Sequence, residues 1–360
     1  TVFRELAFAE IVHERTPIDE VLPLPVAAAP QALMLRSLHS PRSLMCYSAQ
    51  VYSDYRRYMR DSGARLDIAA FTALFAHPDR VPQRSKALDA LLFAPASPEE
   101  GAVKALLDAS NQAQVSAWQQ ELFRQKRRLV QAQRSLEGKS TKRALNDERV
   151  ASLKIRRLTA RIRAIQTADV SPAAARIYPM WYAPIIVIED DQLVIKPMRF
   201  HCRPAGKPAS YDDRFPGCYN ARRDNLTRFW KGQYGINHGV LLASAFYENV
   251  ALHDLEKRPL QEEERAANVV LEFRPRELDF MHVACIWSRW VGPGGEELLS
   301  FAAITDEPPV EVSAAGHDRC IVPLKPSNVK RWLKPGGDTD ACEQLLDDRE
   351  RPYYEHRLAA

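Results

Sequence analysis

The sequence predicts an α+β protein, with a mixed, largely antiparallel β-sheet or open barrel, peripheral helices and an inserted basic α-helical hairpin. Residues 99–168 have a wholly helical pattern, whereas from Tyr178 onward apolar segments of β type alternate with turn residues. A glycine-rich phosphate loop and a regular alternation of strands and helices are both missing, which disfavours a Rossmann-like or P-loop architecture.

The composition is that of a globular protein, with 46% hydrophobic and 27% charged residues among 360. No apolar run approaches the roughly 20 residues of a membrane helix, and residues 1–45 lack a secretion signal pattern, so we expect a cytoplasmic, nucleoid-associated protein. The cysteines are scattered without zinc-like spacing, which favours reduced thiols and predicts no metal or cofactor. They are Cys46, Cys202, Cys218, Cys285, Cys320 and Cys342.

Positive charge is concentrated in one segment. Glu121 to Ile165 contain 14 Lys and Arg against 4 Asp and Glu, a net +10, so the rest of the chain sums to −6 because the total is +4. Such a segment can contact nucleic acid or an acidic partner, although a solvated helical face has the same composition.

Several helices are expected ahead of the strands. Val51, Tyr55, Tyr58 and Met59 recur at helical spacing, and further helices are expected over 67–76 and 84–93. Within 99–168, apolar residues form two heptad-like stripes interrupted at Gly138, which predicts two antiparallel helices. This hairpin is either a purely structural arm or a contact for nucleic acid or a protein partner.

Two hairpins are predicted in the β part. One joins residues 184–189 to 192–200 through Asp190-Asp191, and the other joins 282–291 to 296–305 through a glycine-rich turn. Residues 239–247 and 320–324 supply further strands. The predicted organisation is an N-terminal extension over 1–45 that is either flexible or not part of the mature protein, a catalytic domain over 46–333 that contains the hairpin over 99–168, and a tail over 334–360.

Cys46 follows Met45, and removal of everything before it would give a cysteine with a free α-amine beside its thiol. Such an aminothiol traps aldehydes, because the amine condenses to a Schiff base and the thiol then closes a thiazolidine ring. An α-amine with an ordinary pKa of about 7.7 to 8.0 is partly neutral at pH 7 and therefore nucleophilic. A buried, inert Cys46 is the alternative interpretation.

Three polar segments lie among the predicted strands. Asn220 and Arg222 offer an amide and a guanidinium group, which suit the orientation of a reactant and the binding of phosphate. Glu248 ends an apolar strand, where desolvation would favour its neutral form and suit it to proton transfer. His317 and Arg319 stand in a loop between two strands. A capped loop, a surface carboxylate and a surface histidine are the structural alternatives.

The order of these motifs along the chain resembles the SOS response-associated peptidase (SRAP) family. The motifs are Met-Cys, Ala183-Pro184, Asn-Ala-Arg, an apolar strand ending in Tyr-Glu, and His-x-Arg. Members of this family shield abasic sites in single-stranded DNA by covalent crosslinking. The resemblance runs from Cys46 to about Leu333 and implies an SRAP-like fold. It also implies an enzyme of the peptidase, hydrolase or lyase type in the DNA damage response, acting without a cofactor.

The resemblance assigns a role to each matching residue. Cys46 would form the thiazolidine, Asn220 would hold the amine and sugar, Glu248 would move protons, and His317 would act in ring opening and reversal. The resemblance also assigns DNA contacts, namely phosphate binding by Arg222 and Arg319 and an apolar contact by Pro184. It implies that the partner is single-stranded DNA with abasic sites. Separately, we expect a monomer with no membrane partner.

Three departures from the family pattern indicate a divergent branch. Tyr47-Ser48 follow Cys46 in place of Gly-Arg, Asn249 replaces a tryptophan, and Cys320-Ile321 replace Met-Pro. Two alternative functions stay open. One is an N-terminal-nucleophile hydrolase, which needs an oxyanion hole, and the other is a nucleic-acid-binding scaffold that uses the basic hairpin.

Overall fold

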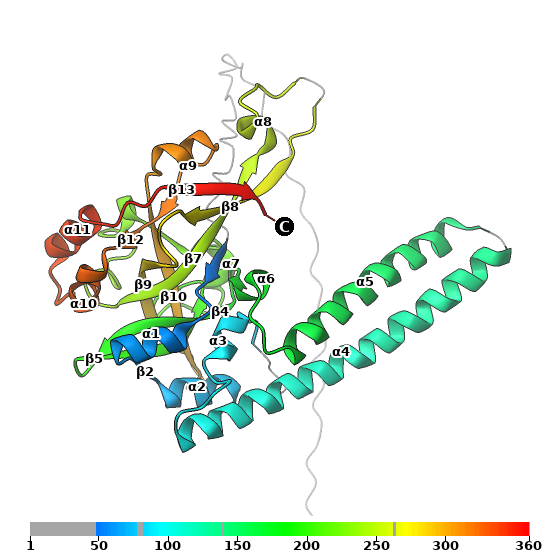
Figure 1. Ribbon diagram of the computed structural model, residues 1–360, viewed down its shortest axis with the longest axis horizontal. Coiled ribbons are helices and arrows are strands. Elements are labelled where there is room, and N and C mark those ends of the chain that lie inside the picture. Colours follow the sequence, from blue (N-terminus) through cyan, green and yellow to red (C-terminus); the bar gives the residue numbers. More distant parts are fainter. Residues whose placement is uncertain (1–47, 78–81, 139, 262–263, 360) are drawn as a thin grey trace, which may run out of the picture. The chain divides into compact units, whose positions relative to one another are not determined.

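The computed structural model describes residues 48–77, 82–138, 140–261 and 264–359. Its strands form one sheet in which five strands close into a barrel, in the order β9-β10-β5-β4-β7, with β7 pairing back to β9 (Figure 1). β10 pairs with β5 in parallel, and the other four pairings are antiparallel. The predicted fold class is confirmed. The barrel strands are β4 (Tyr182–Glu189), β5 (Gln192–Phe200), β7 (His238–Ala251), β9 (Met281–Val291) and β10 (Glu297–Asp306).

Both predicted hairpins are present. Asp190 and Asp191 join β4 to β5 with φ values of 48° and 63°, which are the two positive φ angles of a type I′ turn. Its backbone twist matches that of the flanking strands, so the residues fix the register locally. The β9–β10 turn uses Gly295, whose φ is 83°, a value that glycine adopts without strain.

β7 is the strand on which the sheet is organised. Its first half pairs with β4 and β9 inside the barrel, and its second half pairs with β1 (Ser48–Val51) and β8 (Asn268–Pro275). Its 14 residues are nearly all buried. The expectation that Glu248 ends a strand is wrong, because β7 continues to Ala251 and Glu248 pairs with Leu271 of β8.

The first helix is shorter than its apolar spacing predicts. Val51 belongs to β1 and opposes Ala243 of β7, so the strand uses a residue assigned to the helical stripe. The helix α1 (Tyr55–Ser62) begins after Asp54, whose carboxylate accepts a hydrogen bond from the Arg57 amide. The other expected helices are α2 (Ile68–Phe75), capped by Asp67, and the shorter α3 (Lys86–Ala90), capped by Ser85.

The helical hairpin is formed by α4 (Pro98–Gly138) and α5 (Lys142–Gln166), which run antiparallel along each other (Figure 1). Their contact uses Val115 and Leu158 of the predicted stripes, together with the small residues Ala132 and Ala151. An ion pair of 2.5 Å joins Arg128 of α4 to Asp147 of α5. The N-terminal part of α4 instead packs on α2 and belongs to the main core.

The sequence prediction separates residues 334–360 from the domain as a tail, but the described part of this segment, residues 334–359, folds onto the domain. β13 (Tyr354–Leu358) pairs with β8, and Leu346 and Tyr354 are buried in the main core. The remaining short strands are β2 (Arg65–Leu66), β3 (Arg176–Ile177), β6 (Asn220–Arg222), β11 (Cys320–Ile321) and β12 (Pro323–Leu324). The remaining helices are α6 (Pro172–Ala175), α7 (Tyr211–Arg214), η1 (Arg223–Asn225), α8 (Leu252–Leu255), α9 (Val310–Ala314), η2 (Pro326–Asn328), α10 (Val329–Trp332) and α11 (Thr339–Asp347).

Candidate functional site

Cys46 lies outside the described residues, and the described chain begins two residues later with β1. Ser48, the first residue of β1, opposes Tyr247 of β7, and Tyr247 immediately precedes Glu248. The Arg176 side chain supports this end of β1, because its Nε donates a 2.9 Å hydrogen bond to the Ser48 hydroxyl. The described part of the chain that follows Cys46 is therefore held against the strand that carries Glu248.

Glu248 and His317 form a buried pair. The Nε2 atom of His317 lies 3.0 Å from Oε2 of Glu248, and the two residues are 4% and 0% exposed. They come from separate elements, since Glu248 is on β7 and His317 follows α9 just before β11. The fold thus brings together two residues that lie 69 positions apart in the sequence.

The backbone around His317 sets the direction of its ring. Gly316 has a φ of 91°, and a Cβ atom there would lie 2.9 Å from Cγ1 of Val250 and 3.1 Å from Cβ of Asp254. A larger residue would therefore be strained both by its backbone angle and by contact. Nδ1 of His317 lies 3.0 Å from the Arg319 carbonyl oxygen and 3.2 Å from the Arg319 backbone nitrogen, so it donates to the oxygen when protonated and accepts from the N–H when it is not. This arrangement directs Nε2 toward Glu248.

A carboxyl group and an imidazole at this distance can hold and move a proton. Because Nδ1 has a backbone partner whether or not it is protonated, the contact between Nε2 and Oε2 of Glu248 can be made by one proton on either atom. Proton transfer between such groups is the basis of general acid–base catalysis. The site can therefore protonate a leaving hydroxyl or take a proton from an attacking amine.

Asn220 and Arg222 stand on β6, which pairs in parallel with β10. Thr305 of β10 pairs with Arg222 on one side and with Ile321 of β11 on the other. Neighbouring strands lie about 4.8 Å apart, so the Arg222 and Ile321 backbones are about 10 Å apart. Since His317 is four residues before Ile321, β6 and the Glu248–His317 pair lie toward the same end of β10.

A groove of about 370 Å³ runs beside β6. Asn220 and Arg222 line one part of it, and Phe215, Phe229 and Trp230 supply aromatic surface. Phe229 is 42% exposed and so presents part of its ring to solvent. Arg222 forms an exposed 2.8 Å ion pair with Asp224, and solvent weakens such pairs. The groove therefore combines an amide, a guanidinium group and stacking surfaces.

The other two predicted DNA contacts lie in different places. Arg319 follows His317 closely in the chain and is half-buried. Pro184 is buried in the barrel wall, where its carbonyl accepts a hydrogen bond from the Tyr55 hydroxyl. That hydroxyl also accepts from the amide of Leu242, which lies six residues, or about 20 Å along β7, from Glu248. The structure therefore does not bring Pro184 to the Glu248–His317 pair.

A buried polar cluster beside Ser48 was not foreseen from the sequence. The Arg176 guanidinium lies 3.7 Å from the centre of the Tyr247 ring, and the Tyr247 hydroxyl donates to Oε1 of Gln50 at 2.9 Å. Burial raises the pKa of Tyr247 to about 12, which keeps its hydroxyl protonated near neutral pH. The available signal was Arg176 between apolar residues, because a charged residue in such a position needs a partner.

The five cysteines other than Cys46 are poor nucleophiles. All five are buried, and burial raises the pKa of each thiol, to about 11 for Cys342 and about 12 for Cys218. Burial also raises the pKa of Cys202, Cys285 and Cys320. The thiolate is the reactive form, so none of these five offers one near neutral pH. Any thiol chemistry of the chain is left to Cys46.

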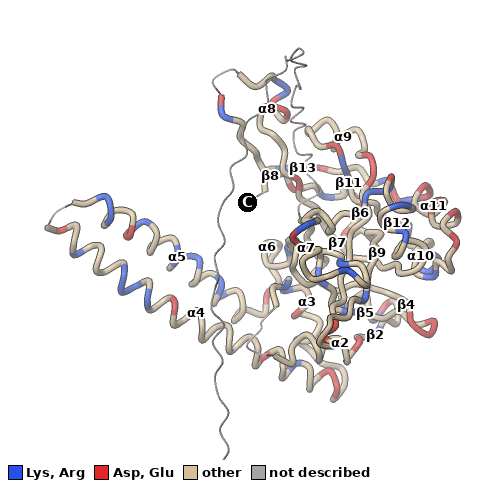
Figure 2. Tube along the Cα trace, turned by 180° about the vertical axis from the view of Figure 1, so that it is seen from behind, with Lys and Arg blue, Asp and Glu red and all other residues tan. Residues whose placement is uncertain are grey.

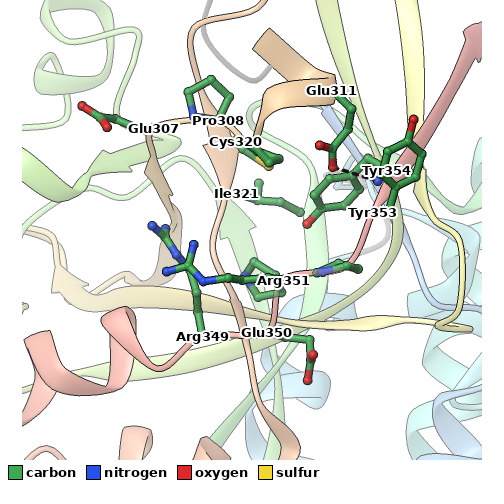
Figure 3. Close-up of a pocket in the computed structure, with 13 residues that line it drawn as sticks. Glu307, Pro308, Glu311, Cys320, Ile321, Arg349, Glu350, Arg351, Tyr353 and Tyr354 are labelled. Carbon is green, nitrogen blue, oxygen red and sulfur yellow. Dashed lines mark hydrogen bonds between the residues drawn. The ribbon is translucent and has the colours of Figure 1, made fainter. Parts of the chain in front are cut away.

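A second cavity of about 370 Å³ lies near the end of β10 (Figure 3). It is lined by residues that include Cys320, Arg349 and Tyr354, and the Glu311 carboxylate accepts a 3.0 Å hydrogen bond from the Tyr354 amide there. None of the predicted site residues lines this cavity. Within the described ranges, no group of three or more His, Cys, Asp or Glu could hold a metal ion. No described helix combines the length and apolar character needed to cross a membrane.

Comparison with solved structures finds proteins of low sequence identity. A protein from Bacteroides thetaiotaomicron has a TM-score of 0.41 at 15% identity, over 51% of this chain and 77% of its own. A protein from Bordetella bronchiseptica has a TM-score of 0.41 at 17% identity, over 52% and 87%. A phage-related protein from Bordetella bronchiseptica has a TM-score of 0.39 at 18% identity, over 51% and 80%.

The family assignment rests on sequence. No curated protein matches the chain. The model of the family described as SOS response associated peptidase (SRAP) matches residues 141–359, which is more than half of the chain. This match extends through β13 and includes Asn220, Glu248 and His317. The family's description links it to the SOS response, and so to DNA damage. The chain belongs to the SOS response associated peptidase (SRAP) family.

Proposed function

We propose that the protein captures abasic sites in single-stranded DNA covalently through Cys46. The observation that carries this proposal is the buried Glu248–His317 pair, adjacent in the fold to the start of β1. Two peptide units span at most about 7 Å, so Cys46 is tethered within that distance of Ser48. Ser48 itself opposes the residue before Glu248.

The reaction needs a free α-amine on Cys46 and the aldehyde of a ring-opened abasic sugar. The amine nitrogen attacks the aldehyde carbon, and the resulting hydroxyl group leaves as water to give a Schiff base. The thiol sulfur then adds to the same carbon, and its proton passes to the nitrogen, which closes the thiazolidine. The net change is the loss of one water molecule.

The Glu248–His317 pair supplies the proton transfers in this sequence. Loss of the hydroxyl requires a proton donor, and formation of the Schiff base requires an acceptor for an amine proton. One proton held between Nε2 of His317 and Oε2 of Glu248 meets both needs in turn. Ring opening of the sugar also needs one proton donor and one proton acceptor, and the Glu248–His317 pair supplies both.

The groove beside β6 suits the DNA strand that flanks the lesion. Phe215 and Phe229 offer faces for unpaired bases, and Arg222 offers a guanidinium group that can exchange its exposed carboxylate partner for a phosphate. Asn220 lies between this groove and β10, where an amide can orient the sugar.

Incubation with single-stranded DNA that carries one abasic site tests the proposal. We expect a denaturant-resistant adduct with protein whose N-terminus is Cys46, and none with Cys46→Ala. Cleavage of a peptide without an adduct would instead support an N-terminal-nucleophile hydrolase. Reversible, salt-sensitive binding without an adduct would support a scaffold.

A further inference from the structure

We propose that the outer face of the α4–α5 hairpin is a second, non-covalent binding surface for single-stranded nucleic acid, separate from the lesion site. α5 carries eight basic and two acidic residues within 25 positions. All eight basic residues are exposed. Figure 2 shows the Lys and Arg positions in succession along the α5 tube. They are Lys142, Arg143, Arg149, Lys154, Arg156, Arg157, Arg161 and Arg163.

These charges are offset little within the described part of the chain, where Lys154 favours the ionised form of Glu121 of α4. None of the eight forms an ion pair there, and Asp147 of the same helix is instead paired with Arg128 of α4. Arg157 has a like charge three residues before it in Lys154 and four residues after it in Arg161. Like charges at these spacings disfavour a helix, and an anionic ligand would offset the repulsion.

The spacing of the charges suits an extended polyanion. Lys142 and Arg163 are 21 residues apart, which is about 32 Å along a helix. Basic residues recur over this whole length of the helix. A chain of phosphates can contact such a surface at many points without any fixed sequence.

A cavity at the base of the hairpin favours single-stranded nucleic acid over an acidic protein. It has a volume of about 380 Å³, within the range of small-ligand sites, and is lined by Trp118 of α4, Trp181 of the body and Arg161 of α5. The Arg161 guanidinium lies 5.8 Å from the centre of the Trp118 ring. Tryptophan faces beside a basic track are how proteins bind unpaired bases.

The geometry therefore assigns two parts to this surface. The exposed basic residues of α5 hold the phosphates, and the cavity with Trp118 and Trp181 receives an unpaired base. This binding requires neither a lesion nor Cys46. It would hold the protein on single-stranded DNA or RNA while the lesion site is empty.

Fluorescence anisotropy with a lesion-free oligo(dT) strand tests the phosphate part, in full-length Cys46→Ala protein so that no adduct forms. Arg156→Gln, Arg157→Gln and Arg163→Gln together should lower the affinity at least tenfold. They should also reduce the slope of log affinity against log salt by about 2, since each lost phosphate contact on a single strand removes about 0.7. All three side chains are exposed, so folding should be retained.

The matched control removes the same charge elsewhere. Arg276, Arg289 and Lys334 are exposed, and each is paired with a carboxylate outside the hairpin. Changing all three to glutamine should leave the salt slope nearly unchanged. Equal behaviour of the two triple variants would overturn the inference, as would a lack of salt-dependent binding, which would point instead to an acidic protein partner.

The cavity is tested with Trp118→Ala, for which Trp118→Phe is the conservative control. We expect Trp118→Ala to weaken oligo(dT) binding about tenfold with little effect on a duplex of the same length, and Trp118→Phe to retain binding. Equal losses for both forms of DNA would reject base insertion. Adduct formation on abasic DNA is scored separately on a denaturing gel, so failure of the crosslinking proposal is distinguishable from failure of this one.

Discussion

The Nε2 atom of His317 lies 3.0 Å from Oε2 of Glu248, and both residues are buried. Replacing Glu248 with glutamine keeps the shape of the side chain but removes the group that exchanges a proton. We expect Glu248→Gln to slow adduct formation roughly 100-fold while DNA binding changes little. Quenched time courses on abasic single-stranded DNA give the rate, and anisotropy gives the affinity.

The control for this variant is Glu297→Gln, an exposed carboxylate on β10 that should leave the rate unchanged. Because Glu248 and His317 act on one proton, combining Glu248→Gln with His317→Gln should slow the reaction less than the product of the two single effects. Wild-type kinetics in a folded Glu248→Gln protein would remove Glu248 from the mechanism.

Gly316 holds the loop that presents His317. Gly316→Ala adds a Cβ atom 2.9 Å from Cγ1 of Val250, at a φ of 91°. We expect a loss of about 1 to 3 kcal/mol in the free energy of unfolding and slower adduct formation, measured by denaturant titration and by the crosslinking assay. Gly206→Ala is the control, since its φ is 74° but no atom lies within 4 Å of the added Cβ. Equal losses in both variants would show that contact with Val250 has no effect.

The outer part of the hairpin should be dispensable for crosslinking. Replacing residues 121–156 with a short Gly/Ser linker leaves Val103 and Leu107 in the core and keeps the Ala164 and Thr167 carbonyls, which accept hydrogen bonds from the Lys86 ammonium. We expect the shortened protein to fold and to form the adduct at nearly the wild-type rate. A folded, inactive product would show that the hairpin takes part in the reaction.

Two histidines, His238 in the core and the partly buried His282, should make stability depend on pH. Burial lowers the pKa of His238 and of His282 to about 4, below the ordinary value of 6.5. As the pH falls from 6.5 to 4, the unfolded chain takes up these protons first, so the free energy of unfolding falls. Each histidine contributes a loss on the order of 3 kcal/mol over this range.

His282→Phe tests this dependence, because phenylalanine can keep the aromatic contacts of His282 with Tyr58 and Phe280. Denaturant titrations at several pH values should show a smaller fall in stability between pH 6.5 and 4 than in the wild-type protein. An unchanged fall would mean that His282 is not held neutral in the folded state.

Local features of the sequence predicted the hairpins and the helical arm well. Asp190-Asp191 specify a turn by their own backbone preferences, and the Gly138 interruption marks the change of direction between α4 and α5. Val51 was misassigned because a single residue at helical spacing cannot reveal that its backbone pairs with β7. Closure of the barrel by β7 and β9 likewise depends on contacts distant in sequence.

In the candidate site, too, local features were predictable from the sequence and contacts between distant residues were not. The order of Asn220, Glu248 and His317 was visible in the sequence through its resemblance to the family, but the contact between Glu248 and His317 was not. Full burial of Glu248 follows from the continuation of β7 and its pairing with β8, which local pattern does not encode. The cluster around Arg176 depends on partners from β1 and β7 and was missed for this reason.

The most direct test is the mass of the product formed on abasic single-stranded DNA. Protein that begins at Cys46 should give one species equal to protein plus oligonucleotide minus one water, and Cys46→Ser should give no such stable species. Protein that retains residues 1–45 should also give none, because its Cys46 nitrogen is an amide. An adduct of that mass on protein retaining residues 1–45, or on Cys46→Ser, would contradict the account.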